Sequence, residues 1–101
     1  MIPDFQTLML PLLKFIADEK NHSTKDTVTH LANEFKLTEE ELSEWLPSKV
    51  QKVFYNRVHW AKAHLKMADL IENVDRGIFK ITADGKRILL KNPEKKSPYV
   101  I

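Results

Sequence analysis

The segment from Gln51 to Thr82 changes from a helical period to a strand period, and this change constrains the fold more than any other feature. In its first part an apolar side chain recurs at helical spacing, which predicts one long helix with a single buried stripe. The stripe consists of Phe54, Val58, Ala61, Leu65 and Ala68. The apolar residues then alternate, and Asp75-Arg76-Gly77 supplies a turn because glycine tolerates a positive φ. We therefore expect a helix at about 51–69 and a hairpin at about 71–81.

The side of this helix opposite the apolar stripe is basic. At about 100° per residue, one set of polar side chains falls together there. The set comprises Lys52, Tyr55, Asn56, His59, Lys62 and Lys66. No acid occurs from Lys49 to Met67, although the chain holds 14 Asp and Glu against 16 Lys and Arg. A solvated lysine face is the plain interpretation, but the hairpin that follows and the mixture of Asn, Tyr and His with lysine favour a nucleic-acid surface.

Charge is divided unevenly between the two halves of the chain. Residues 1–48 hold four basic and nine acidic side chains, a net of −5, whereas residues 49–101 hold twelve basic and five acidic ones, a net of +7. In a compact domain this asymmetry predicts one positive surface suited to phosphates.

Composition limits the protein to a few classes. With 101 residues and 43% hydrophobic content, the chain can form one modest core. It has no cysteine, which removes disulfides and thiol chemistry. It also lacks a signal-peptide pattern and any apolar run near the roughly 20 residues of a membrane span. We expect a cytoplasmic protein with no membrane contact, one domain over residues 1–92, and a basic tail or the start of a linker at 93–101.

Helices are also expected on both sides of this segment. Helical spacing continues from Phe5 to Ile16, and Pro11 within it predicts a kink or a restart because proline removes a backbone donor. Capping-box signatures at Ser23–Asp26 and Thr38–Glu41 predict two more helix starts. We expect the second of these helices to turn Leu42, Trp45 and Leu46 inward before Pro47 stops it.

Thr82 is expected to cap a last helix, in which Gly85 is an unfavourable residue. Four helices, a hairpin and a final helix predict a mainly α fold with a small β-hairpin. A winged helix-turn-helix is the simplest closed arrangement of these elements, and a purely helical bundle is the rival.

Several blocks of sequence resemble the N-terminal domain of Mrr-type restriction endonucleases. They are Leu8-Met9-Leu10-Pro11-Leu12-Leu13, Leu37-Thr38-Glu39-Glu40-Glu41, Leu46-Pro47-Ser48, Asn56-Arg57-Val58-His59-Trp60-Ala61, Ala68-Asp69-Leu70-Ile71 and Arg76-Gly77-Ile78-Phe79-Lys80-Ile81-Thr82. The resemblance implies a winged-helix domain that binds duplex DNA ahead of a separate C-terminal nuclease domain of the PD-(D/E)xK class. Such enzymes cut modified, often methylated, DNA. Asp69 departs from the glycine that the family pattern leads us to expect before Leu70.

Helix-turn-helix docking assigns roles along the basic helix, because the N-terminal part of a recognition helix meets base edges. The base-reading candidates are Gln51, Tyr55, Asn56 and His59. The candidates for phosphate or wing contacts are Lys49, Lys52, Lys62, Lys66, Arg76 and Lys80, since cationic side chains position DNA more than they specify its sequence. Three structural alternatives stay open: Asn56 could brace the preceding loop, Arg57 could pair with an acid of the helix from Thr38, and Trp60 is expected in the core.

The sequence predicts neither catalysis nor a metal site, and no cofactor. The tripeptides Glu34-Phe35-Lys36 and Glu94-Lys95-Lys96 resemble part of a nuclease signature, but metal-dependent cleavage needs carboxylates that converge from a rigid framework. The competing function is a winged-helix module for protein–protein interaction or for dimerisation, including a homodimer. Such an interface would expose aromatic and apolar anchors, whereas the predicted face offers Tyr55 as its one large ring.

Overall fold

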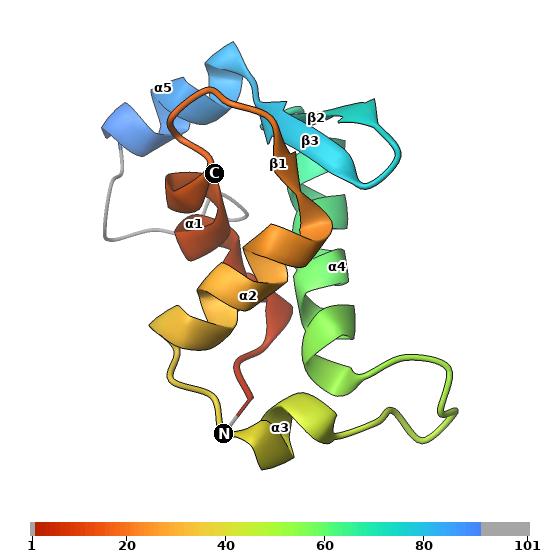
Figure 1. Ribbon diagram of the computed structural model, residues 1–101. Coiled ribbons are helices and arrows are strands. Elements are labelled where there is room, and N and C mark those ends of the chain that lie inside the picture. The colour runs from red at the N-terminus through yellow and green to blue at the C-terminus, as the bar shows by residue number, and fades with distance from the viewer. Residues whose placement is uncertain (1, 92–101) are drawn as a thin grey trace.

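The computed structural model describes residues 2–91, which form a helix-rich domain with a small antiparallel sheet (Figure 1). The elements are α1 (Phe5–Phe15), β1 (His22–Ser23), α2 (Thr24–Glu34), α3 (Glu39–Ser43), α4 (Val53–Met67), β2 (Ile71–Asp75), β3 (Ile78–Ile81) and α5 (Ala83–Lys91). The predicted class, mainly α with a β-hairpin, is confirmed. The predicted tail at 93–101 lies outside the described residues. Within residues 2–91, no helix has the length and apolarity needed to cross a membrane.

The core lies between α1 and α4, which make the most extensive contact between two helices (Figure 1). The fully buried side chains of α1 are Leu8, Met9, Leu12 and Leu13. They meet the predicted stripe of α4, in which Phe54, Val58, Ala61 and Leu65 are buried. Ala68 is exposed and follows the helix, so this last position of the stripe was wrong. Burial of one side of α4 leaves its other side available as a surface.

Side chains cap the helices where the sequence predicted helix starts. The Ser23 side chain accepts from the Asp26 backbone N–H at 3.0 Å and begins α2. Thr38 and Glu41 form a complete capping box, with bonds of 3.1 and 2.8 Å. Thr82 Oγ1 accepts from the Gly85 backbone N–H at 3.1 Å, which confirms its predicted role at the start of α5. In α1, the predicted restart at Pro11 is wrong because the helix continues to Phe15.

The sheet contains a third strand that the sequence analysis missed. Its order is β1-β3-β2, and both pairs are antiparallel. In the register, His22 lies opposite Phe79, and Ile71 lies opposite Ile81. With only two residues, β1 has no periodicity to identify, but its pairing covers one edge of a hairpin that would be marginal alone.

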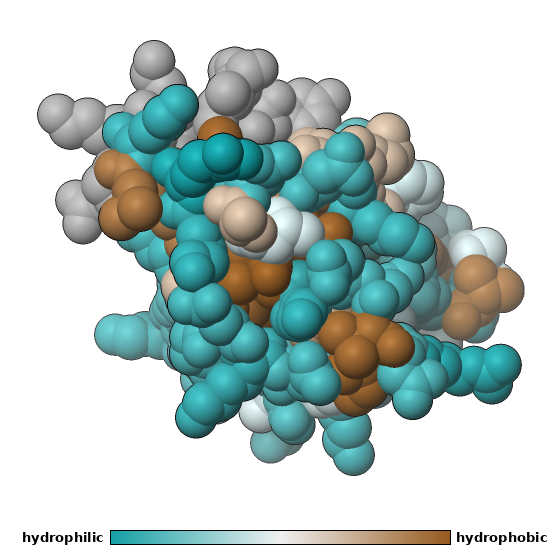
Figure 2. Space-filling model, turned by 90° about the horizontal axis from the view of Figure 1, so that it is seen from above, coloured by the Kyte–Doolittle hydropathy of each residue, from teal (hydrophilic) through white to brown (hydrophobic). Residues whose placement is uncertain are grey.

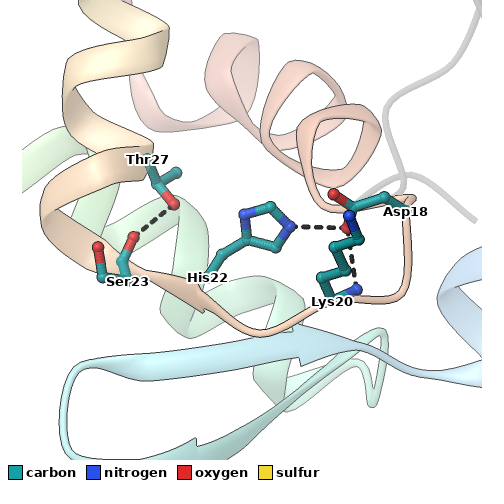
Figure 3. A network of polar contacts seen from close by, with 5 residues as sticks. All are labelled: Asp18, Lys20, His22, Ser23 and Thr27. Atoms are coloured by element: carbon teal, nitrogen blue, oxygen red, sulfur yellow. Dashed lines mark hydrogen bonds and ion pairs between the residues drawn. The ribbon is translucent and has the colours of Figure 1, made fainter.

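A polar network holds the turn that leads into β1 (Figure 3). Asp18 Oδ1 accepts from His22 Nε2 at 2.7 Å and from the Lys20 backbone N–H at 2.9 Å. These bonds lower the pKa of Asp18, and the bond from His22 is the larger cause. On the other side of the strand, Thr27 Oγ1 donates to the Ser23 carbonyl at 2.8 Å. The network thereby fixes β1 between the end of α1 and the start of α2.

The C-terminal end of α4 explains the departure at Asp69. The Asp69 backbone N–H bonds to the Lys66 carbonyl, and the Leu70 N–H bonds back to the Leu65 carbonyl at 2.9 Å. This pair of bonds is a Schellman motif, which requires a left-handed residue and therefore favours glycine. Asp69 has φ +60°, a conformation that aspartate tolerates better than most residues. Asp69 therefore ends α4 with the same backbone conformation that the glycine expected from the family pattern would adopt.

The helix that begins at Glu39 is shorter than expected. It ends at Ser43, where Glu44 adopts an extended conformation. Trp45 then forms an isolated antiparallel bridge with Lys52 instead of continuing the helical turn. As a result, Trp45 is 51% exposed, and the prediction that it faces inward is wrong.

Gly85 packs too closely on its neighbours to accept a larger residue. A Cβ atom at this position would lie 2.3 Å from the Leu70 carbonyl oxygen and 2.7 Å from Ile81 Cγ1. Gly85 was predicted to weaken the helix, but its missing side chain allows α5 to approach the end of α4 and the sheet.

Gly85→Ala should destabilise the domain by about 1–3 kcal/mol through overpacking, although alanine favours a helix by about 1 kcal/mol. Urea unfolding measures the change. Gly77→Ala is the matched control, because a Cβ there meets nothing within 4 Å but φ is +69°, a backbone strain of about 1 kcal/mol. Stabilisation by Gly85→Ala would show that the close packing is wrong.

Candidate nucleic-acid interface

The exposed side of α4 lies between two projecting loops. In Figure 1 the loop that joins α3 to α4 projects beside the first turn of α4, and the β2–β3 turn projects on the same side near its other end. The segment from Lys49 to Met67 contains no acid. The structure thus places a basic helix face and two loops on one side of the molecule.

The predicted base-reading residues divide into two pairs. Asn56 Nδ2 donates to Gln51 Oε1 at 2.9 Å, and both residues are half-buried. This contact is the bracing role that was the alternative for Asn56. Tyr55, 40% exposed, and His59 instead lie on the outer surface of α4. The structure therefore presents Tyr55 and His59 more openly than the braced pair.

Most of the predicted phosphate-contact residues are exposed. Lys49 and Lys52 lie in the loop before α4, and Lys66 lies in its last turn. Arg76 is exposed in the β2–β3 turn. Lys80 is half-buried in β3, with Nζ 3.7 Å from Glu72 Oε1, so part of its charge is already compensated.

Lys62 does not lie with the exposed lysines. Its Nζ donates to Thr24 Oγ1 at 2.9 Å and lies 4.8 Å from the centre of the Phe79 ring. Thr24 also reaches the β2–β3 turn, because its backbone N–H bonds to the Gly77 carbonyl at 2.9 Å. Burial is the main reason that the pKa of Lys62 is lowered, and the nearby charge of Lys66 adds to it. This ammonium group connects α4 to the start of α2 and, through Thr24, to the turn.

A shallow hollow separates α4 from the sheet. It has a volume of ≈ 210 Å³ and is lined by His59, Lys62, Ala63, Lys66 and Asn73. Asn73 belongs to β2 and was missed by the sequence analysis, because its position opposite α4 depends on how the hairpin folds back. The hollow thus combines two lysines and an imidazole with an amide from the sheet.

Trp60 and Arg57 both have part of their side chains at the surface. Trp60 is 50% exposed, so its predicted burial is wrong. It lies about 120° around α4 from the buried stripe, and its ring is 6.0 Å from that of His59 and 6.2 Å from that of His64.

Arg57 is half-buried, and among residues 2–91 no ion pair joins it to α3. Its charge instead helps to lower the pKa of Asp4 at the start of α1, where the hydrogen bond from the Thr7 backbone is the larger cause. The predicted pairing of Arg57 with the helix from Thr38 is therefore not found.

The end of the molecule seen from above is mostly hydrophilic. Figure 2 shows separate apolar patches surrounded by polar side chains, not one continuous apolar area. Scattered apolar residues of this kind are normal on a protein surface. Within residues 2–91, no group of three or more His, Cys, Asp or Glu side chains could hold a metal ion.

Comparison with known proteins identifies one family. A family model described as the Mrr N-terminal domain matches residues 5–91, which include every helix and strand given above. No curated protein and no solved structure matches the chain.

The ammonium group of Lys62 should titrate below 10.5, the value of an unperturbed lysine, because half-burial disfavours its charge. Nuclear magnetic resonance of the lysine side chains can follow this titration. Lys66→Ala should raise the Lys62 midpoint by removing a like charge, whereas Lys14→Ala, at the end of α1, should leave it unchanged. A Lys62 midpoint at or above 10.5 would contradict the described placement.

Proposed function

The chain belongs to the Mrr N-terminal domain family, and on this premise we propose that it is a winged-helix domain that binds duplex DNA. In this proposal α4 is the recognition helix and the β2–β3 hairpin is the wing. The order of the elements and the pairing of β1 with β3 support this assignment. The domain would direct an Mrr-type restriction endonuclease to modified, including methylated, DNA in the cytoplasm.

The observation that carries the proposal is the composition of the outer surface of α4. One side of this helix is fully buried, and the segment from Lys49 to Met67, which contains its other side, holds no acid and exposes Lys49, Lys52 and Lys66. DNA binding depends first on neutralising the charge of the phosphates. Acidic side chains would repel the phosphates, and none occurs from Lys49 to Met67. The exposed Arg76 extends this surface to the wing.

The two kinds of contact would be divided along the surface. Lys49, Lys52 and Lys66 would contact phosphates, since a flexible ammonium group adapts to the backbone without selecting a base. Tyr55 and His59 would face the groove, and the Gln51–Asn56 pair would read bases only after exchanging its mutual hydrogen bond for one to DNA. Lys62 would act mainly by holding the wing near α4 through Thr24.

Cleavage would belong to a separate C-terminal nuclease domain of the PD-(D/E)xK class. The matched family is that of an N-terminal domain, and it does not include the nuclease. Residues 5–91 would thus supply target selection, and the nuclease domain would supply the metal-dependent chemistry.

A protein–protein interaction or dimerisation role is the second candidate, and the structure offers one observation in its favour. Trp60 and Met67 lie on one edge of α4 and are 50% and 75% exposed. Aromatic residues and methionine are enriched at protein interfaces. Sedimentation equilibrium of the isolated protein tests this role: a dimer that is lost in Trp60→Ala would support it.

Fluorescence anisotropy with labelled duplex DNA, methylated and unmethylated, tests DNA binding. With about four phosphate contacts, the logarithm of affinity should fall against the logarithm of salt with a slope of roughly −4. Lys52→Ala, Lys66→Ala and Arg76→Ala should each weaken binding to all sequences and reduce the slope by about 1. His59→Ala should instead alter the preference between sequences or between modification states.

Lys14→Ala is the control, because Lys14 is exposed on α1, which packs on the buried side of α4. It should leave affinity and slope nearly unchanged. Equal losses in Lys14→Ala and Lys66→Ala would place the binding surface elsewhere. Absence of binding at low salt by the folded protein would reject the proposed function.

A further inference from the structure

The loop between α3 and α4 supplies Lys49 and Lys52 to the proposed function, which gives no role to the tryptophan that the same loop exposes. Its backbone is closed by two bonds across the loop, from the Val53 N–H to the Glu44 carbonyl at 2.8 Å and from the Leu46 N–H to the Gln51 carbonyl at 3.0 Å. Between them, Trp45 and Lys52 form the antiparallel bridge. At the tip, Lys49 has φ +57° and bonds to the Leu46 carbonyl at 2.8 Å. The loop is thus a small, backbone-bonded hairpin.

Trp45 is the largest side chain that this loop exposes. Its surface is 51% accessible, and the Lys52 ammonium group lies 5.7 Å from its ring centre. Residues in an antiparallel pair point to the same side, so the ring and the cation form one unit. Cation–π attraction at an exposed site contributes about 0.5–1 kcal/mol and helps to hold the indole in one orientation. The unit lies immediately before the first turn of α4.

We propose that Trp45 and Lys52 form a second nucleic-acid contact, in which the indole ring stacks on an unpaired nucleobase and Lys52 binds the adjoining phosphate. An indole face stacks on any base, whereas the faces of paired bases are covered by their neighbours in the duplex. The ligand is therefore a duplex with one base out of the stack, and not a fully paired one. This inference rests on the proposed function, because the duplex beside that base would bind α4.

The charge around the loop favours nucleic acid over a protein partner. Lys49 and Lys52 both lie in the loop, and no acid follows until Asp69. The acids of α3 and Glu44, which follows the helix, all precede Trp45. These carboxylates would repel a phosphate that approached from the α3 side, so the bound DNA strand should run from Trp45 toward Lys52 and α4.

Trp60 provides a matched control. Its exposure, 50%, is nearly the same as that of Trp45. Trp60 lies in α4 and not in the loop, and its ring lies beside those of His59 and His64. Trp60→Phe leaves Trp45 as the sole tryptophan, and Trp45→Phe leaves Trp60, so each ring can be observed separately. Both rings are exposed, so these changes should preserve the fold, which circular dichroism checks.

The experiment titrates both single-tryptophan proteins with a fully paired duplex and with the same duplex carrying one bulged adenine. The bulged duplex should quench Trp45 and leave Trp60 nearly unchanged. In the 101-residue protein, Trp45→Ala should weaken binding to the bulged duplex by about 5- to 150-fold, the range that one stacked base contributes. It should alter binding to the paired duplex by less than about threefold, and Trp60→Ala should alter neither.

Each other outcome has a distinct meaning. Salt-dependent binding of both duplexes with no quenching of Trp45 would overturn the stacking proposal and leave the proposed function standing. No binding of either duplex would overturn both. A change in Trp45 fluorescence with protein concentration alone, without DNA, would overturn the proposal in favour of self-association through the loop.

Discussion

A junction around Thr24 ties the turn of the hairpin to α4 and to the start of α2. This residue bonds through its backbone N–H to the Gly77 carbonyl in the hairpin turn, and its hydroxyl accepts from the Lys62 ammonium group of α4. Thr24 itself is buried at the start of α2. One threonine therefore connects three parts of the domain, and the surface that α4 and the turn share is defined by these bonds. The buried side chains of the hairpin, Ile71, Phe79 and Ile81, join the same core as the helices and hold the hairpin from its inner face.

The sequence predicted the elements whose formation is local. The apolar stripe of α4, the capping box at Thr38 and the cap at Thr82 each depend on residues within a few positions, and all three are confirmed except for Ala68 at the end of the stripe. The sequence did not predict β1, because two residues carry no period and pair only with a strand more than fifty residues later. It also placed Trp45 and Trp60 inside. Whether a ring is buried depends on the distant element that covers it, and helical spacing does not contain this information.

In the candidate site, too, the sequence predicted the features that depend on nearby residues and missed those that depend on distant elements. The acid-free face of α4 follows from the sequence, and exposure of Tyr55, His59 and Lys66 agrees with it. The role of Lys62 does not follow, since its partners Thr24 and Phe79 come from other elements. Asn73 was missed for a similar reason. The two exposed tryptophans make a protein-interaction role stronger than the sequence indicated. Aromatic rings at the surface can contact either nucleobases or a protein partner.

In the proposed function, DNA lies across the outer surface of α4 and the β2–β3 turn. The most direct test is a titration of isotope-labelled protein with duplex DNA, followed residue by residue in nitrogen–proton correlation spectra. If DNA lies there, the signals of Tyr55, His59, Lys66 and Arg76 should shift, and that of Lys14 on α1 should not. Shifts confined to the acids of α3 or to the surface of α1, or none from a folded protein at low salt, would contradict it.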